Sequence, residues 1–118
     1  MSYARKETVA CTATAGGVVT AYSPVMTGQV INAIYTKTNF SDGAVLLITG
    51  EDSGITIWSE TGVNATEVHS PVQLASLNTT GADSTLEHNP VFVVGERIKI
   101  AMTGAGNGTT GSFTFIVA

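Results

Sequence analysis

The 118-residue chain has little of what catalytic, nucleic-acid-binding and membrane proteins need. It contains one cysteine, so it forms no internal disulfide. Only 12% of the residues are charged, and nine acidic against five basic residues give a net charge of −4. Because a nucleic-acid-binding protein needs a surplus of Lys and Arg, this balance argues against nucleic acid as a partner. The longest apolar run, residues 44–48, is too short to cross a membrane.

The residues that are abundant favour β-strands. Eighteen threonines accompany many valines and isoleucines, and these β-branched residues fit a pleated sheet better than a helix. Thirteen glycines divide the chain at short intervals, as expected for turns between strands. Since no segment shows a convincing helical spacing of apolar residues, the sequence predicts an all-β protein.

Alternating apolar and polar residues predict eight or nine short antiparallel strands, at the spacing typical of a sandwich. In the clearest of these, Ile98, Ile100 and Met102 are predicted to face the core. We expect the whole chain (residues 1–118) to form a single domain, a jelly-roll-like β-sandwich with two sheets packed face to face. The order of the strands in the sheets is left open.

Three parts of the first half carry specific expectations. Residues 6–14 and 18–22 are predicted to be strands joined by a turn at a glycine pair. The second of them should end at Pro24, because proline has no N–H for the ladder, and a new strand should cover residues 29–38. Residues 44–48 are apolar on both faces, which predicts a central strand.

No recognisable catalytic motif is present. His69 and His88 lie near predicted loops, and neither has the context of a nucleophile and its base. Cys11 alternates with apolar residues and is interpreted as a small buried hydrophobe. Residues 106–111 match G-x-G-x-x-G, but a strand and the end of the chain follow, so the helix that would hold a phosphate is missing.

The acidic residues are candidates for catalytic carboxylate pairs and for metal ligands. Glu51 and Asp52 lie in a glycine-flanked turn, where acidic residues are common. The remaining candidates are Glu60, Glu67, and the loop group Asp83, Glu87 and His88. We therefore expect no catalytic residue, no cofactor and no metal ion.

The candidate interface residues are three residues near the amino terminus and the single tryptophan. Tyr3, Arg5 and Lys6 belong to a short arm (residues 1–6) that either frays or clasps a neighbouring subunit. Trp58 either fills the core, which is the favoured interpretation, or anchors a contact between subunits.

Six segments resemble small virion proteins of tailed bacteriophages. They describe turns and strands rather than chemistry, and they cover much of the chain from residue 37 onward. The first thirty residues match only in their Thr and Val character. The segments are KTNFSDG at 37–43, ITGE at 48–51, IWSET at 57–61, VNA at 63–65, ERIKI at 96–100 and GSFTFIV at 111–117.

This resemblance implies a non-enzymatic structural protein similar to capsid decoration (cement) proteins. The implied partner is the major capsid protein, the implied assembly is a homo-oligomer, a trimer, and the implied location is the capsid surface of the virion. Synthesis in the host cytoplasm is expected, since no apolar segment of a signal peptide follows the basic residues at the amino terminus.

Three alternatives stay open. The first is another virion component, such as a tail, neck or head-fibre protein. The second is a carbohydrate-binding module, in which Trp58, Tyr22 or Tyr35 would stack on sugar rings. The third is a small hydrolase, which would need a pocket that holds His69 or His88 beside a nucleophile.

Overall fold

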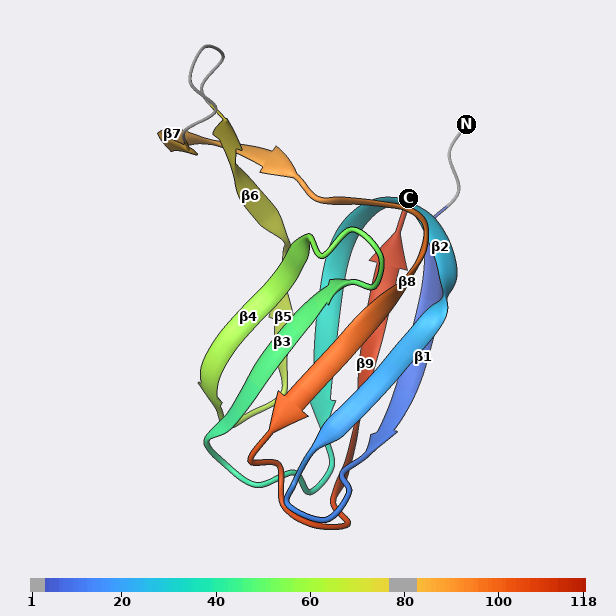
Figure 1. Ribbon diagram of the computed structural model, residues 1–118, viewed down its shortest axis with the longest axis vertical. Coiled ribbons are helices and arrows are strands. Elements are labelled where there is room, and N and C mark those ends of the chain that lie inside the picture. Colours follow the sequence, from blue (N-terminus) through green and yellow to red (C-terminus); the bar gives the residue numbers. More distant parts are fainter. Residues whose placement is uncertain (1–3, 77–82) are drawn as a thin grey trace.

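The computed structural model describes the main chain of residues 4–76 and 83–118 and the side chains of residues 4–72 and 89–118. Within these ranges the chain forms nine strands and no helix (Figure 1), which confirms the predicted all-β domain. The strands are Arg5–Thr12 (β1), Val19–Lys37 (β2), Ala44–Gly50 (β3), Thr56–Val63 (β4), Glu67–His69 (β5), Val72–Ser76 (β6), Asp83–Pro90 (β7), Phe92–Thr103 (β8) and Thr110–Val117 (β9).

Seven strands form one antiparallel sheet that curls back on itself as two layers (Figure 1). One layer has the order β5-β2-β9-β1, and the other has the order β4-β3-β8-β2. Strand β2 belongs to both, because residues 19–29 pair with β8 and residues 30–37 pair with β9. The remaining strands, β6 and β7, pair with each other in a hairpin at one end of the sandwich.

The continuous strand β2 corrects the prediction of two separate strands around Pro24. The pairing of β2 with β8 shifts register between Tyr22 and Val25, so Pro24 lies where the ladder is already interrupted. Ser23 is 2% exposed, and its hydroxyl oxygen accepts a hydrogen bond from the N–H of Ile98 at 2.9 Å in place of a main-chain carbonyl. A bulge therefore accommodates the proline within the strand.

Strand β1 does not pair with β2, the strand that follows it in the sequence. The turn after β1 is tight, with the Thr14 N–H donating to the carbonyl of Val18 at 2.9 Å. Beyond this turn β1 and β2 diverge into different layers, and β1 pairs with the distant strand β9 instead. The adjacent segments therefore do not form an extended hairpin.

The core lies between the two layers and follows the predicted alternation. Ile98, Ile100 and Met102 of β8 are at most 1% exposed, as expected. Strand β3 is central within its layer, between β8 and β4. Only one of its faces is covered, however, because Val45 and Leu47 are 44% and 42% exposed. The apolar outer face of β3 is thus part of the surface.

Candidate interaction surface

The structure places two of the predicted arm residues inside the first strand. Arg5 and Lys6 pair with the last two residues of β9. The predicted arm over residues 1–6 is therefore wrong for Arg5, because β9 continues far enough to provide its ladder partner, whereas Lys6 also began the strand predicted over residues 6–14 and lies in it. Tyr3 lies outside the described residues.

The Arg5 side chain connects the beginning of β1 to the other layer. Its Nη1 donates to the carbonyl oxygen of Val25 on β2 at 3.0 Å, and its Nε pairs with the Glu7 carboxylate at 2.8 Å. Lys6 is exposed on the outer face of the sheet. Both basic residues are thus held at a fixed place on the surface.

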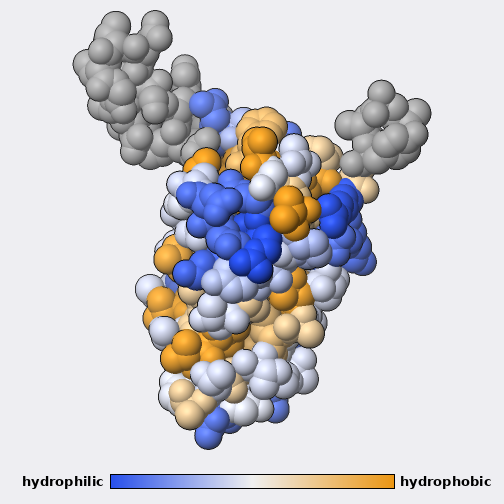
Figure 2. Space-filling view, turned by 45° about the vertical axis from the view of Figure 1, so that its right-hand side comes forward, coloured by the Kyte–Doolittle hydropathy of each residue, from blue (hydrophilic) through white to orange (hydrophobic). Residues whose placement is uncertain are grey.

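Exposed apolar side chains gather at the same end of the molecule. Val25 is 57% exposed, Phe92 is 50% exposed and Val94 is 73% exposed. They lie where β2 and β8 pair, toward the end of the molecule that holds the beginning of β1, the end of β9 and the β6–β7 hairpin (Figure 1). In Figure 2 hydrophobic residues lie at this upper end, around a hydrophilic area. We call the surface formed by Arg5, Val25, Phe92 and Val94 the arm end.

Sequence reasoning missed Phe92 and Val94, although the sequence contains a signal for them. Residues 91–94 are four consecutive apolar residues. Val91 and Val93 are 0% exposed, so the alternation of a strand turns the other two outward. Such a run places apolar side chains on both faces of the strand. Where only one face is covered by another layer, the side chains on the other face form an exposed apolar patch.

Trp58 lies on β4, on the opposite side of the sandwich from β1 (Figure 1), and fills the core. It is 2% exposed, stacks on His69 with ring centroids 5.0 Å apart, and meets Phe113 edge-on at 6.4 Å. The core interpretation is therefore confirmed, and the buried ring offers no exposed anchor. Its neighbour Ile57 is buried as well, because a register shift between β3 and β4 turns two consecutive residues inward.

The rings proposed for sugar stacking do not form an exposed platform. Trp58 is buried, and Tyr35 is 0% exposed. Burial, followed by the charges of Asp42 and Glu67, raises the pKa of Tyr35 to about 12, and its buried hydroxyl has no hydrogen-bond partner. The ring of Tyr22 is 38% exposed, but the Arg97 guanidinium lies over it, 4.2 Å from the centroid.

Two carboxyl groups meet between the edge strands β4 and β5. The hydrogen bond that protonated Glu67 donates to Glu60, then burial, then the Glu60 charge raise the pKa of Glu67 to about 7. Two adjacent carboxylates repel each other, so Glu67 keeps its proton to a higher pH than an isolated glutamate, as its raised pKa indicates. Glycosidases place a sugar between carboxyl groups that are about 5 Å or more apart, so a directly hydrogen-bonded pair does not have that geometry.

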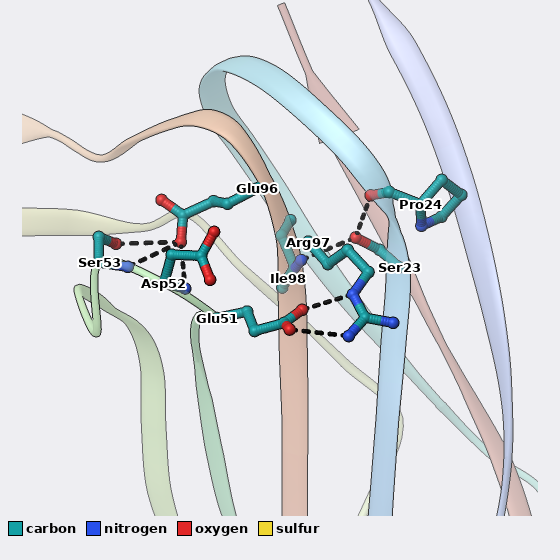
Figure 3. Close-up of polar contacts among 8 residues, drawn as sticks. All are labelled: Ser23, Pro24, Glu51, Asp52, Ser53, Glu96, Arg97 and Ile98. Carbon is teal, nitrogen blue, oxygen red and sulfur yellow. Dashed lines mark hydrogen bonds and ion pairs between the residues drawn. The ribbon is translucent and has the colours of Figure 1, made fainter.

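The carboxylate of Glu96 holds the turn between β3 and β4 (Figure 3). Glu96 is 6% exposed, and its Oε1 accepts hydrogen bonds from the N–H groups of Asp52 and Ser53 at 3.0 and 3.1 Å. The Ser53 hydrogen bond is the main reason that its pKa is lowered. A side chain on Gly50 would overlap this carboxylate and the Ser53 hydroxyl, so a larger residue there would displace both groups. This acidic group has a structural role.

The neighbouring acidic residue, Glu51, is paired with Arg97 on the outer face (Figure 3). Two guanidinium nitrogens meet the two carboxylate oxygens, with Nη2 to Oε1 at 2.7 Å. This hydrogen-bonded pairing lowers the pKa of Glu51. Arg97 also covers Tyr22, so the charged groups on this face bind one another.

The remaining catalytic candidates do not come together in the described structure. Cys11 is buried, and burial raises the pKa of its thiol to about 11. The side chains of Asp83, Glu87 and His88 lie outside the described ranges. Among the described residues there is no pocket and no group of three His, Cys, Asp or Glu side chains placed to hold a metal ion.

In the described part of the chain, no helix is long and apolar enough to span a membrane. Comparisons with protein-family models, curated proteins and solved structures find no match to this chain. The surface features described above are therefore the basis for a functional proposal.

Proposed function

We propose that this protein is a non-enzymatic structural component of a phage virion, a capsid decoration (cement) protein that binds the outer capsid surface and stabilises the head. The observation that carries the proposal is the apolar arm end, where Val25, Phe92 and Val94 are half or more exposed and Arg5 bonds to the carbonyl of Val25. Exposed apolar side chains that gather in one place mark contact surfaces. A contact surface is what a decoration protein needs.

The rest of the described surface supports binding rather than catalysis. The carboxylate of Glu96 holds a turn, and Glu51 is engaged by Arg97. Glu67 lies against Glu60, which raises the pKa of Glu67. These three acidic groups, among those whose side chains the structure describes, thus have structural partners on the protein itself.

The resemblance to virion proteins of tailed phages supports the capsid as the site of binding. The proposed partner is the major capsid protein, contacted by a homo-oligomer of this chain. A modest interface that is repeated by the symmetry of a shell gives high avidity. The net charge of −4 suits the outer surface of a capsid better than a surface that faces packaged DNA.

Binding of variants to capsids that lack the protein tests the role of the arm end. The double variant Phe92→Ser/Val94→Ser should lose most of its binding, because it removes two apolar contacts without changing the core. The matched control is Val45→Ser/Leu47→Ser, which removes two exposed apolar residues from β3. Equal binding by the two double variants would contradict the assignment of the arm end.

Particle stability tests the decoration role itself. Particles stripped of the protein should release DNA at a lower temperature than complete particles, and adding the purified protein should restore the difference. The copy number distinguishes a decoration protein, present in step with the capsid lattice, from a tail, neck or head-fibre component, present in few copies. Unchanged release of DNA from stripped particles would reject the proposal.

The arm is tested by deleting residues 1–4, which leaves Arg5 and Lys6 in their ladder with β9. We expect weaker particle binding with unchanged unfolding of the free protein. Full occupancy of the capsid by the truncated chain would show that the arm makes no contact.

A further inference from the structure

Strand β1 is a long and regular edge of the sheet. It pairs with β9 over eight consecutive positions without a register shift, and no other described strand pairs with it. At the opposite border β4 pairs with β3 through two register shifts, and β5 has only three residues. The first half of β2 carries Pro24 and a register shift. Bulges, prolines and short strands protect edges from pairing, and β1 has none of these; its charged residues, which also protect edges, are confined to its first three positions.

The main-chain groups of alternate β1 residues point away from β9. Ala13, which follows β1, donates its N–H to the Thr109 carbonyl at 2.8 Å and accepts from the Gly108 N–H at 3.1 Å. Since bonding to one neighbour alternates along an antiparallel strand, the odd-numbered residues of β1 bond to β9. The even-numbered residues then direct their N–H and C=O groups to the free edge; they are Lys6, Thr8, Ala10 and Thr12.

The hydrogen bonds of Thr110 agree with this assignment. Thr110 is the ladder partner of Thr12, but its own N–H bonds to Asn39 Oδ1 at 2.7 Å and its carbonyl accepts the Asn39 N–H at 3.0 Å. Asn39 lies just beyond β2, on the other side of β9. Thr12 is therefore not hydrogen-bonded to its ladder partner, and its main-chain groups face the free edge.

The charges of β1 lie at one end of this edge. Arg5, Lys6 and Glu7 are its first three residues, and the five residues from Thr8 to Thr12 carry no charge. Val9 is half-buried against the core, at the margin of the sandwich. An antiparallel second copy of β1 would place its charged end against the uncharged end of the first.

We propose that β1 pairs antiparallel with β1 of a second copy of this chain, about a two-fold axis at Val9. In this register Lys6 is opposite the partner's Thr12, and Thr8 is opposite the partner's Ala10. The two charged ends are about 20 Å apart along the strands. The full overlap makes about eight main-chain hydrogen bonds, and each side-chain contact occurs twice because the interface is two-fold.

The side chains explain why the occupant is a second copy. Val9 meets the partner's Val9 across the axis, so both half-buried side chains become covered. Like charges never face each other in this register, whereas an axis at Lys6 or Glu7 would oppose two equal charges. This inference is independent of the proposed function, because it is tested with the purified protein and without a capsid.

The first experiment measures the mass in solution by sedimentation equilibrium. We expect a dimer at high micromolar concentration, and a monomer for Ala10→Pro, which removes a donor from the free edge but none from the β9 ladder. Ala10→Ser keeps the donor and should dimerise like the unchanged chain. A monomer for the unchanged chain, the trimer that the resemblance implies, or a dimer that survives Ala10→Pro would each overturn the proposal.

The second experiment does not depend on how Ala10→Pro folds. In the proposed register the two Val9 residues form a pair without mutual hydrogen bonds, whose Cα atoms are about 4.5 Å apart, within disulfide range. Val9→Cys should therefore give a disulfide-linked dimer on mild oxidation. Val45→Cys, exposed on the outer face of β3, is the control. Crosslinking that is no faster for Val9→Cys than for the control would refute the pairing.

Discussion

The two lateral sides of the sandwich differ in how their edge strands are connected (Figure 1). Between β4 and β5, Trp58 stacks on His69, and Glu67 lies against Glu60, which raises the pKa of Glu67. These side chains join the two layers across the gap between them. We call this the sealed side, because side chains close the gap between the two layers there.

On the other side, β1 and the first half of β2 diverge from a tight turn. The Arg5 guanidinium connects the layers there by its hydrogen bond to the carbonyl of Val25. No aromatic ring of the described residues bridges the two strands. Large side chains therefore stabilise the sealed side of the sandwich. On the other side, which we call the open side, the outer main-chain edge of β1 has no partner among the described strands.

The largest effect is expected from Trp58→Ala, which would open the sealed side. Removing a fully buried aromatic ring costs about 3–5 kcal/mol of unfolding free energy, because contacts are lost and a cavity remains. Urea unfolding followed by circular dichroism measures it. Phe92→Ala, at the exposed arm end, should cost less than about 1 kcal/mol. Comparable losses for the two variants would contradict the assignment of Trp58 to the core.

A smaller effect is expected from Ser23→Ala on the open side. Ser23 Oγ accepts from the Ile98 N–H and donates to the Pro24 carbonyl at 2.8 Å. Its loss leaves a buried N–H without a partner, which costs about 1–3 kcal/mol. Urea unfolding and faster hydrogen exchange at Ile98 check this. Ser59→Ala, an exposed control on β4, should change neither quantity.

The pH dependence distinguishes the carboxyl pair of the sealed side from the carboxylates of the β3–β4 turn. Because the pKa of Glu67 is raised from 4.5 to about 7, the folded chain holds this proton more tightly than the unfolded chain. The resulting stability is complete below pH 4.5 and is lost as the pH rises through about 7. The melting temperature should therefore fall over this range.

Glu67→Gln should flatten this decline, since its amide can bond to Glu60 without titrating. Glu51→Gln should flatten the opposite slope, which lies in acid, because the lowered pKa of Glu51 means that its contribution is present near neutral pH and is lost as the pH falls. This variant should therefore be less stable than the unchanged chain near neutral pH and approach it in acid. Melting curves of the three proteins between pH 3 and pH 9 provide the comparison. An equally steep decline for Glu67→Gln would exclude the pair as its cause.

The smallest effect is expected from Arg5→Ala, which removes the single guanidinium bridge of the open side. The ion pair with Glu7 is exposed, and exposed pairs contribute at most about 1 kcal/mol. Urea unfolding at low and high salt should show a loss of this size that decreases with salt. A loss as large as that of Trp58→Ala would mean that the two sides are sealed equally well.

Some features followed from local sequence, and others did not. The inward faces of β8 and β9 were predictable, because alternation alone decides which residues share a face. Trp58 and Ile57 break the alternation at a bulge, which the sequence does not signal. The apolar pair at Phe92 and Val94 was visible as a run of four apolar residues, but its exposure depends on the absence of a covering layer.

The β-branched composition, the glycine-marked turns and the period of two determined by themselves that this chain forms an all-β domain with its large apolar side chains inside. These are local properties, since each residue's preference for a strand depends on its own side chain and its near neighbours. Only the tertiary structure decided that β2 serves both layers, that β1 pairs with β9, and that its outer edge is open. Pairing between distant strands depends on how the whole chain packs, and local sequence does not encode it.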